Sequence, residues 1–174
     1  WLQCFADGGR RIKKIDGAAI RRALAPSHEG LTQSDLDHDR LRERGIACGL
    51  TVGKWNLKAT EDHVDELWRV LATGILDGSL PADSVKCAAR RNASPALASR
   101  KFRYTLCVYT NDGLTDRNSV MRLREALHEL NVEQKCTQPL YWKPDLYTLL
   151  PLSGTTYLWI DGVDTKFWCE HWNL

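Results

Sequence analysis

Long apolar runs are missing from this sequence: no stretch approaches the roughly 20 residues that a helix needs to cross a membrane. The chain also has no Cys-x-x-Cys pair, no cluster of histidines and no glycine-rich loop between a predicted strand and a predicted helix. These absences exclude the usual sequence signatures of a zinc site, a redox-active disulfide and a P-loop. We therefore predict a domain outside the membrane, with neither a metal nor an organic cofactor.

The cysteines show no pairing pattern, and they are scattered along the chain at Cys4, Cys48, Cys87, Cys107, Cys136 and Cys169. Three disulfides would suit a small secreted protein, but the sequence shows no signal peptide at its start. A chain of 174 residues can also bury a core without such cross-links. We predict reduced thiols and a cytoplasmic location that can extend to the nucleus.

An excess of charge of one sign is missing too, because the formal net charge is only +2. A net charge this small does not by itself indicate nucleic-acid binding, which depends on local clusters of Lys and Arg. Hydrophobic residues at 43% and charged residues at 26% are typical of a globular protein. The chain is predicted to fold, with residues 1 to 50 as a weakly patterned lead-in and residues 51 to 174 as a single domain.

Hydrophobic periodicity predicts both strands and helices. The amphipathic helices expected in the domain cover residues 61 to 76 and 116 to 130, and shorter helices are expected at 18 to 24 and 34 to 44. The expected strands cover residues 54 to 58, 84 to 89, 102 to 109 and 140 to 142, with a hairpin of 157 to 160 and 165 to 169. This order has too few strand and helix alternations for a parallel sheet. The predicted fold class is α+β, a curved antiparallel sheet with helices packed on one face.

One segment is strongly basic although the whole chain is nearly neutral. Between Val85 and Thr110 there is no acidic residue, and the positive charges there are Lys86, Arg90, Arg91, Arg100, Lys101 and Arg103. Such a cluster attracts anions, and phosphate groups above all. A solvated surface loop explains the same pattern, and that alternative stays open.

The first strand of the predicted domain adds further polar groups. Because side chains alternate along a strand, Lys54, Asn56 and Lys58 share one side. Trp55, which lies between them, is expected to point into the core. We expect the three polar residues to line a groove that faces Lys86, and we expect one exposed ring among the seven Trp residues to stack on a base.

Several motifs together resemble a known family. They are Gly53-Lys54-Trp55, Asp65-Glu66-Leu67-Trp68, Tyr104-Thr105-Leu106-Cys107-Val108-Tyr109-Thr110 and Tyr141-Trp142-Lys143-Pro144-Asp145-Leu146-Tyr147-Thr148. On these motifs, residues 53 to 150 resemble the family of uncharacterised proteins related to basophilic leukaemia expressed protein. That family is similar in fold to the cap-binding translation initiation factor. The resemblance implies a curved antiparallel sheet backed by helices, with Arg90, Arg91 and Arg100 near the phosphates of a ligand.

The function expected from these residues is non-enzymatic binding of a phosphate-bearing ligand, such as a nucleotide, a cap-like group or an RNA. The expected contacts are Lys54, Asn56, Lys58, Lys86, Arg90, Arg91, Arg100 and Arg103. A protein partner on the helical face is a further expectation.

A weaker resemblance, to the phosphothreonine lyases of bacterial effectors, gives an enzymatic alternative. Those enzymes have Lys-x-His on a strand and a catalytic Lys about 30 residues later, and Lys54-Trp55-Asn56 and Lys86 fall at that spacing. The resemblance implies that Lys86 is the base that removes the proton α to the carbonyl. Asn56 replaces the acid His of that pattern, and an amide cannot protonate a leaving group at neutral pH.

Overall fold

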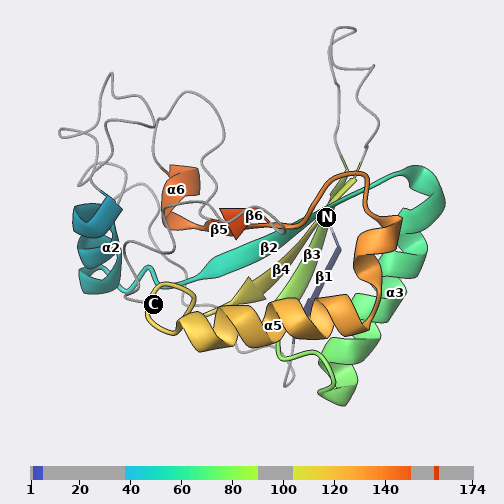
Figure 1. Cartoon of the computed structure of the whole chain (residues 1–174), viewed down its shortest axis with the longest axis horizontal. Coiled ribbons are helices and arrows are strands. Elements are labelled where there is room, and N and C mark those ends of the chain that lie inside the picture. Colours follow the sequence, from blue (N-terminus) through green and yellow to red (C-terminus); the bar gives the residue numbers. More distant parts are fainter. Residues whose placement is uncertain (1, 6–37, 90–103, 150–158, 161–174) are drawn as a thin grey trace, which may run out of the picture.

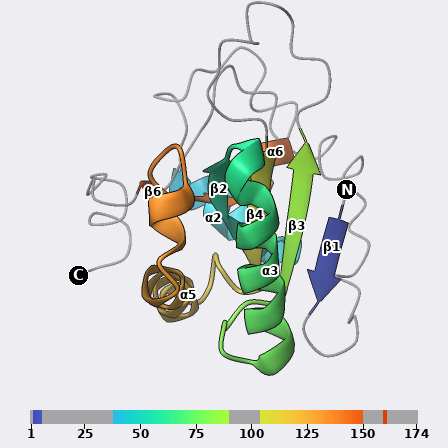
Figure 2. The same cartoon turned by 90° about the vertical axis from the view of Figure 1, so that its right-hand side faces the viewer.

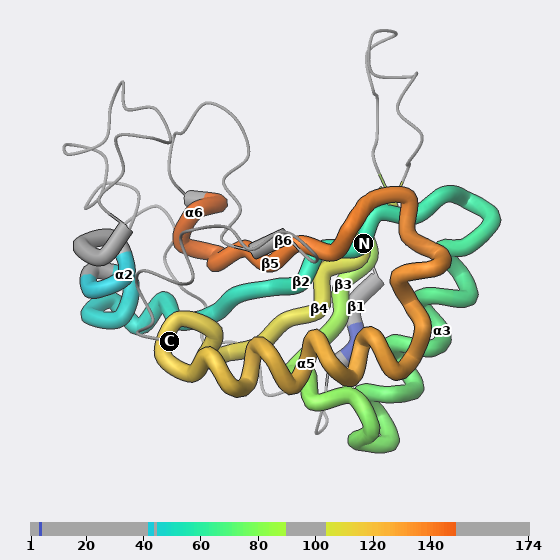
Figure 3. Tube along the Cα trace, in the orientation of Figure 1, coloured from blue at the N-terminus to red at the C-terminus, as the bar shows by residue number. Residues whose placement is uncertain are grey.

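The computed structural model describes residues 2–5, 38–89, 104–149 and 159–160, and within them it shows one antiparallel sheet with helices (Figure 1). The strands are β1 (Leu2–Phe5), β2 (Gly53–Ala59), β3 (Ser84–Ala89), β4 (Tyr104–Thr110), β5 (Tyr141–Pro144) and β6 (Trp159–Ile160). Their order across the sheet is β1-β3-β4-β2-β5-β6, and every neighbouring pair is antiparallel. Strands β3 and β4 are consecutive in the chain, whereas β2 lies between β4 and β5, which are distant from it in sequence (Figure 3).

The described helices are α2 (His38–Ala47), α3 (Glu61–Asp77), α5 (Arg117–Glu129), the short α6 (Leu146–Leu149) and the 3-10 helix η3 (Val132–Lys135). Helices α3 and α5 cover the same face of the sheet (Figures 1 and 2). Helix α2 lies at one end of the sheet, where the Nε of Arg42 donates a 3.0 Å hydrogen bond to the carbonyl of Leu114.

The two long helices form where the sequence supplies an apolar stripe and end signals. Helix α3 buries Val64, Leu67, Leu71 and Ile75 at helical spacing, and it ends at Gly78, whose φ of 78° is left-handed. Helix α5 begins after Asp116, whose carboxylate accepts a 3.2 Å hydrogen bond from the backbone N–H of Ser119. Its buried face consists of Val120, Leu123 and Leu127.

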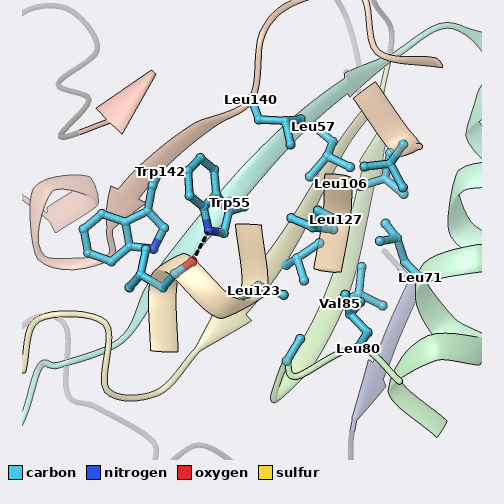
Figure 4. Packing of buried hydrophobic residues seen from close by; sticks show 14 of the residues in the cluster. Trp55, Leu57, Leu71, Leu80, Val85, Leu106, Leu123, Leu127, Leu140 and Trp142 are labelled. Atoms are coloured by element: carbon cyan, nitrogen blue, oxygen red, sulfur yellow. Dashed lines mark hydrogen bonds between the residues drawn. The ribbon is translucent and has the colours of Figure 1, made fainter. Parts of the chain in front are cut away.

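The hydrophobic core lies between these helices and the sheet (Figure 4). Trp55 of β2 and Trp142 of β5 are fully buried in it, and they are directly opposite each other in the strand register. The indole N–H of Trp55 donates a 3.2 Å hydrogen bond to the backbone carbonyl of Val120, which ties β2 to α5. Leu57, Leu106, Val108 and Val85 complete the sheet side of the core.

The predicted fold class is confirmed: the chain is α+β, with an antiparallel sheet and helices on one face. The helices predicted at 61 to 76 and 116 to 130 and the strand predicted at 84 to 89 correspond closely to α3, α5 and β3. The predicted inward position of Trp55 is confirmed as well.

Other elements differ from the prediction, or the segments predicted to form them are outside the described residues. The helix predicted at 34 to 44 is observed at His38–Ala47, and residues 34 to 37 are outside the described residues. The strand β1, which was not predicted, comes from the segment interpreted as a lead-in and pairs with β3 at one edge of the sheet. The predicted helix at 18 to 24 and the predicted strand at 165 to 169 are outside the described residues.

Candidate functional site

The face of the sheet opposite α3 and α5 is the candidate site, and we call it the lysine face. By strand register it carries Ser84, Lys86 and Ala88 of β3, Thr105, Cys107 and Tyr109 of β4, Lys54, Asn56 and Lys58 of β2, and Tyr141 and Lys143 of β5. Among the described strand residues of this face there are four lysines and no Asp or Glu. Lysines at this density, on a surface without strand carboxylates, make a local positive field.

Lys54 is largely enclosed, with 12% of its side chain accessible. Its Nζ lies 2.5 Å from the Oδ1 of Asp145, a residue placed directly after the end of β5. On the neighbouring strand, Lys143 is the register partner of Lys54. Burial lowers the pKa of Lys143 and the charge of Lys54 lowers it further, whereas Asp145 acts in the opposite direction. Within the described part of the chain, Asp145 is thus the carboxylate that acts on both ammonium groups.

Two tyrosine rings lie beneath lysine ammonium groups on this face. The Nζ of Lys54 is 5.4 Å from the centroid of the Tyr109 ring, and the Nζ of Lys58 is 5.6 Å from the centroid of the Tyr141 ring. Both distances are within the range of a cation–π interaction. Lys58 also donates a 2.8 Å hydrogen bond to the hydroxyl of Thr105 on β4. The ring faces and the hydroxyl hold the two ammonium groups in defined places.

The centre of the lysine face is neutral and polar. The side-chain amide of Asn56 is buried, and its Nδ2 donates to the carbonyls of Lys54 and Tyr141 at 3.3 and 3.5 Å. Its Oδ1 accepts a hydrogen bond from the Sγ of Cys107 at 3.5 Å. Burial raises the pKa of the Cys107 thiol although nearby lysines oppose this shift. Cys107 is therefore a protonated thiol at neutral pH and a weak nucleophile.

Lys86 extends the positive field onto β3. It is the register partner of Cys107, which in turn is the register partner of Asn56. Strand spacing puts the Cα atoms of Lys86 and Asn56 about 10 Å apart, on the same side of the sheet. Lys54, Asn56 and Lys58 share one side of β2, as predicted, and Lys86 lies on the same side of the sheet. The groove expected between them stays a prediction.

The other predicted contacts, Arg90, Arg91, Arg100 and Arg103, are outside the described residues, and so is Lys101. The expected stacking Trp is not found among the described side chains: Trp55 and Trp142 are fully buried, and Trp68 packs against the core. Trp1, Trp159, Trp168 and Trp172 are not among the residues whose side chains are described.

Sequence reasoning missed three residues of the site, Tyr141, Lys143 and Asp145. The signal was available in the alternation of the short strand, because an inward Trp142 places Tyr141 and Lys143 on the other side. The register that brings Lys143 beside Lys54 is a pairing between distant segments, and the sequence does not show it.

A hollow lies beside α5 and η3, away from the lysine face. It has a volume of about 450 Å³ and is lined by Arg124, His128, Glu133, Cys136, Thr137, Gln138, Pro139 and Leu140. His128 Nδ1 and Glu133 Oε2 are 2.7 Å apart at this hollow. The protein partner expected on the helical face stays a prediction.

The described part of the chain offers neither a metal site nor a disulfide. No group of three or more His, Cys, Asp or Glu side chains there can hold a metal ion. Cys4, Cys48, Cys87, Cys107 and Cys136 are all free thiols, as predicted for them. None of the described helices is long and apolar enough to cross a membrane.

Comparison with known proteins identifies the family. No curated protein matches the chain at a significant level. A family model described as "Basophilic leukemia-expressed protein Bles03" matches residues 4–151. This range includes β2, β3, β4 and β5 completely and β1 in part, and it ends before β6. The resemblance inferred from the strand and helix motifs is thereby confirmed, and the chain belongs to the Bles03 family.

Proposed function

We propose that the lysine face binds a phosphate-bearing ligand without transforming it. The proposal rests on one observation: Lys54, Lys58, Lys86 and Lys143 lie on the same face of the four neighbouring strands β3, β4, β2 and β5. Phosphate is the anion that fits best, because it carries more than one negative charge and several acceptor oxygens.

The balance of charge around Lys143 supports this proposal. A half-buried ammonium group loses hydration, and it is stable only when an opposite charge replaces the water. Asp145 pairs with Lys54, and the pKa of Lys143 is lowered first by burial and then by the charge of Lys54, with Asp145 opposing the shift. A bound phosphate would supply the missing negative charge and raise the pKa of Lys143 again.

The proposal predicts that Lys143→Met weakens phosphate binding. We expect about a tenfold loss of affinity, or about 1.4 kcal/mol, because one charge-assisted contact is removed. The measurement is isothermal titration calorimetry of the full chain with pyrophosphate, GTP and a short RNA, at low and high salt. Binding should weaken as the salt concentration rises.

Lys135→Met is the matched control, since it removes one lysine from the helical side. Lys135 Nζ lies 2.8 Å from Glu66 Oε1, away from the lysine face. Its loss should leave the affinity unchanged within about twofold, because a distant exposed charge is screened. The proposal is wrong if none of the three ligands binds, or if Lys143→Met and Lys135→Met behave alike.

A phosphothreonine lyase is the second candidate, because Lys86 and Asn56 lie on the same face of the sheet, as that reading requires. The Asn56 amide is engaged with backbone carbonyls and with the Cys107 thiol, and it has no proton to give at neutral pH. We therefore expect no loss of phosphoric acid from a phosphothreonine peptide, measured by mass spectrometry. Turnover that Lys86→Ala abolishes would replace the binding role by catalysis.

A further inference from the structure

The aromatic rings of the lysine face are occupied by the protein itself. Tyr109 and Tyr141 are both buried, and each has a lysine ammonium group within 6 Å of its ring centroid. A base that stacked on either ring would have to displace that ammonium group. These two rings therefore position cations instead of a base. The tryptophans whose side chains are described belong to the core on the opposite side of the sheet, so they do not stack on a ligand at this face.

The cations are arranged as a compact array. Lys54 and Lys58 are four residues apart on β2, which corresponds to about 13 Å between their Cα atoms. Lys86 and Lys143 lie on β3 and β5, at either side of the central strands. The Cα atoms of the four lysines, which come from three strands, therefore lie within a patch of about 14 by 13 Å. A ligand with several phosphoryl groups close together can meet more than one of them at once.

The neutral centre of the face fits the same ligand. Between the lysines lie the Cys107 thiol and the hydroxyl of Thr105, and burial raises the pKa of the Tyr109 phenol. None of these groups carries a negative charge at neutral pH, so none repels phosphate. Asn56 turns its amide to backbone carbonyls of this sheet instead of presenting a donor pattern that reads one base.

We infer that the lysine face recognises a compact polyphosphate group by its number of phosphoryl groups and not by an attached base. This inference rests on the proposed function and names the class of ligand. Lys54, Lys58, Lys86 and Lys143 bind the phosphoryl oxygens. Tyr109 and Tyr141 are positioning residues, because each acts through the lysine above its ring.

The test compares inorganic phosphate, pyrophosphate and tripolyphosphate with ATP, GTP and a methylated cap analogue, by calorimetry on the full chain. Affinity should rise about tenfold with each added phosphoryl group, because each can meet a further ammonium group. ATP, GTP and the cap analogue should bind within about threefold of tripolyphosphate, since the base adds no contact of its own.

Each outcome assigns the failure to one idea. If no phosphate compound binds, the proposed function itself is wrong. If GTP, the cap analogue or a short RNA binds and tripolyphosphate does not, phosphate binding stands and recognition by phosphoryl number is overturned. Equal affinities for phosphate and tripolyphosphate would also overturn it.

Two variants of one tyrosine test the positioning role. Tyr141→Phe keeps the ring below Lys58 and should retain the affinity for tripolyphosphate, whereas Tyr141→Leu removes the ring and should lower it about fivefold. Circular dichroism and thermal unfolding must show that both variants fold. If the leucine variant does not fold, Lys58→Met is measured in its place. A loss of affinity for tripolyphosphate below twofold in that variant contradicts a role of Lys58 in binding, and with it the positioning role of Tyr141.

Discussion

At the scale of single residues, two glycines fix the place of Trp142. A Cβ atom on Gly53 would lie 2.1 Å from Cζ2 of Trp142, and a Cβ atom on Gly113 would lie 2.5 Å from the same atom. The indole is fully buried, and Trp142 is the register partner of Trp55 on the neighbouring strand. It cannot move aside without opening the core. Glycine is needed at both positions because no side chain fits there.

Gly53→Ala is therefore expected to destabilise the protein by about 1–3 kcal/mol through overpacking. The measurement is urea unfolding of the variant and the parent chain. The double variant Gly53→Ala with Trp142→Leu should be less destabilised than the sum of its single variants, because the smaller side chain makes room. Additive effects would show that the contact between Gly53 and Trp142 does not set the cost.

Another residue-scale feature is the double use of Lys54. Its ammonium group pairs with Asp145 and lies over the ring of Tyr109, so β2, β4 and the residue after β5 meet at one ammonium group. An exposed ion pair contributes little to stability. The ammonium group of Lys54 is largely enclosed, so water and salt screen its pair with Asp145 less. The charge of Lys54 also reaches Lys143, which links the structural pair to the proposed ligand.

At the scale of secondary-structure elements, the elements with a clear hydrophobic periodicity of their own could be predicted from the sequence. Helices α3 and α5 carry long apolar stripes with end signals, and both were predicted with ends within one residue of those observed. Strand β2 alternates over seven residues, so its polar side was predicted too. Strand β1 has only four residues, too few for a periodicity, and its place beside β3 depends on pairing across the whole sheet.

Part of the lysine face could be predicted for the same reason. Lys54, Asn56 and Lys58 share one strand, and their common side follows from alternation alone. Lys143 and Asp145 reach the face only through the pairing of β5 with β2, a contact between segments about 90 positions apart in the chain. A single sequence states the alternation within each strand but not which strands are neighbours.

At the scale of the whole molecule, charge is unevenly distributed. The lysine face lies on one side of the sheet, and α3 lies on the other side (Figure 2). Helix α3 carries the exposed carboxylates Glu61, Asp62, Asp65 and Glu66, whereas α5, on the same side, carries Arg117, Arg122 and Arg124. The net charge of +2 conceals this uneven distribution. The lysine face attracts an anionic ligand through its local cluster of cations, although the chain as a whole is nearly neutral.

Stability of the whole molecule should fall in alkaline solution, and Cys136 gives a measurable part of the fall. Burial raises the pKa of its thiol from 9.0 to about 11, and the charge of Glu133 adds to the shift. Between these values the folded chain keeps the proton that the unfolded chain loses. The stabilisation is therefore complete below pH 9 and is lost as the pH rises to about 11.

The expected contribution of Cys136 is about 2–3 kcal/mol over this range, at 1.36 kcal/mol for each unit of pKa. Burial also raises the pKa values of Cys87, Cys107 and Tyr109, so they act in the same direction, whereas the lowered pKa of Lys143 opposes them. Urea unfolding from pH 8 upward should show that the parent chain loses stability faster than Cys136→Ala. Cys48→Ala, which removes an exposed thiol, is the matched control. Parallel curves for the parent chain and Cys136→Ala would show that the Cys136 proton does not distinguish the folded state from the unfolded one.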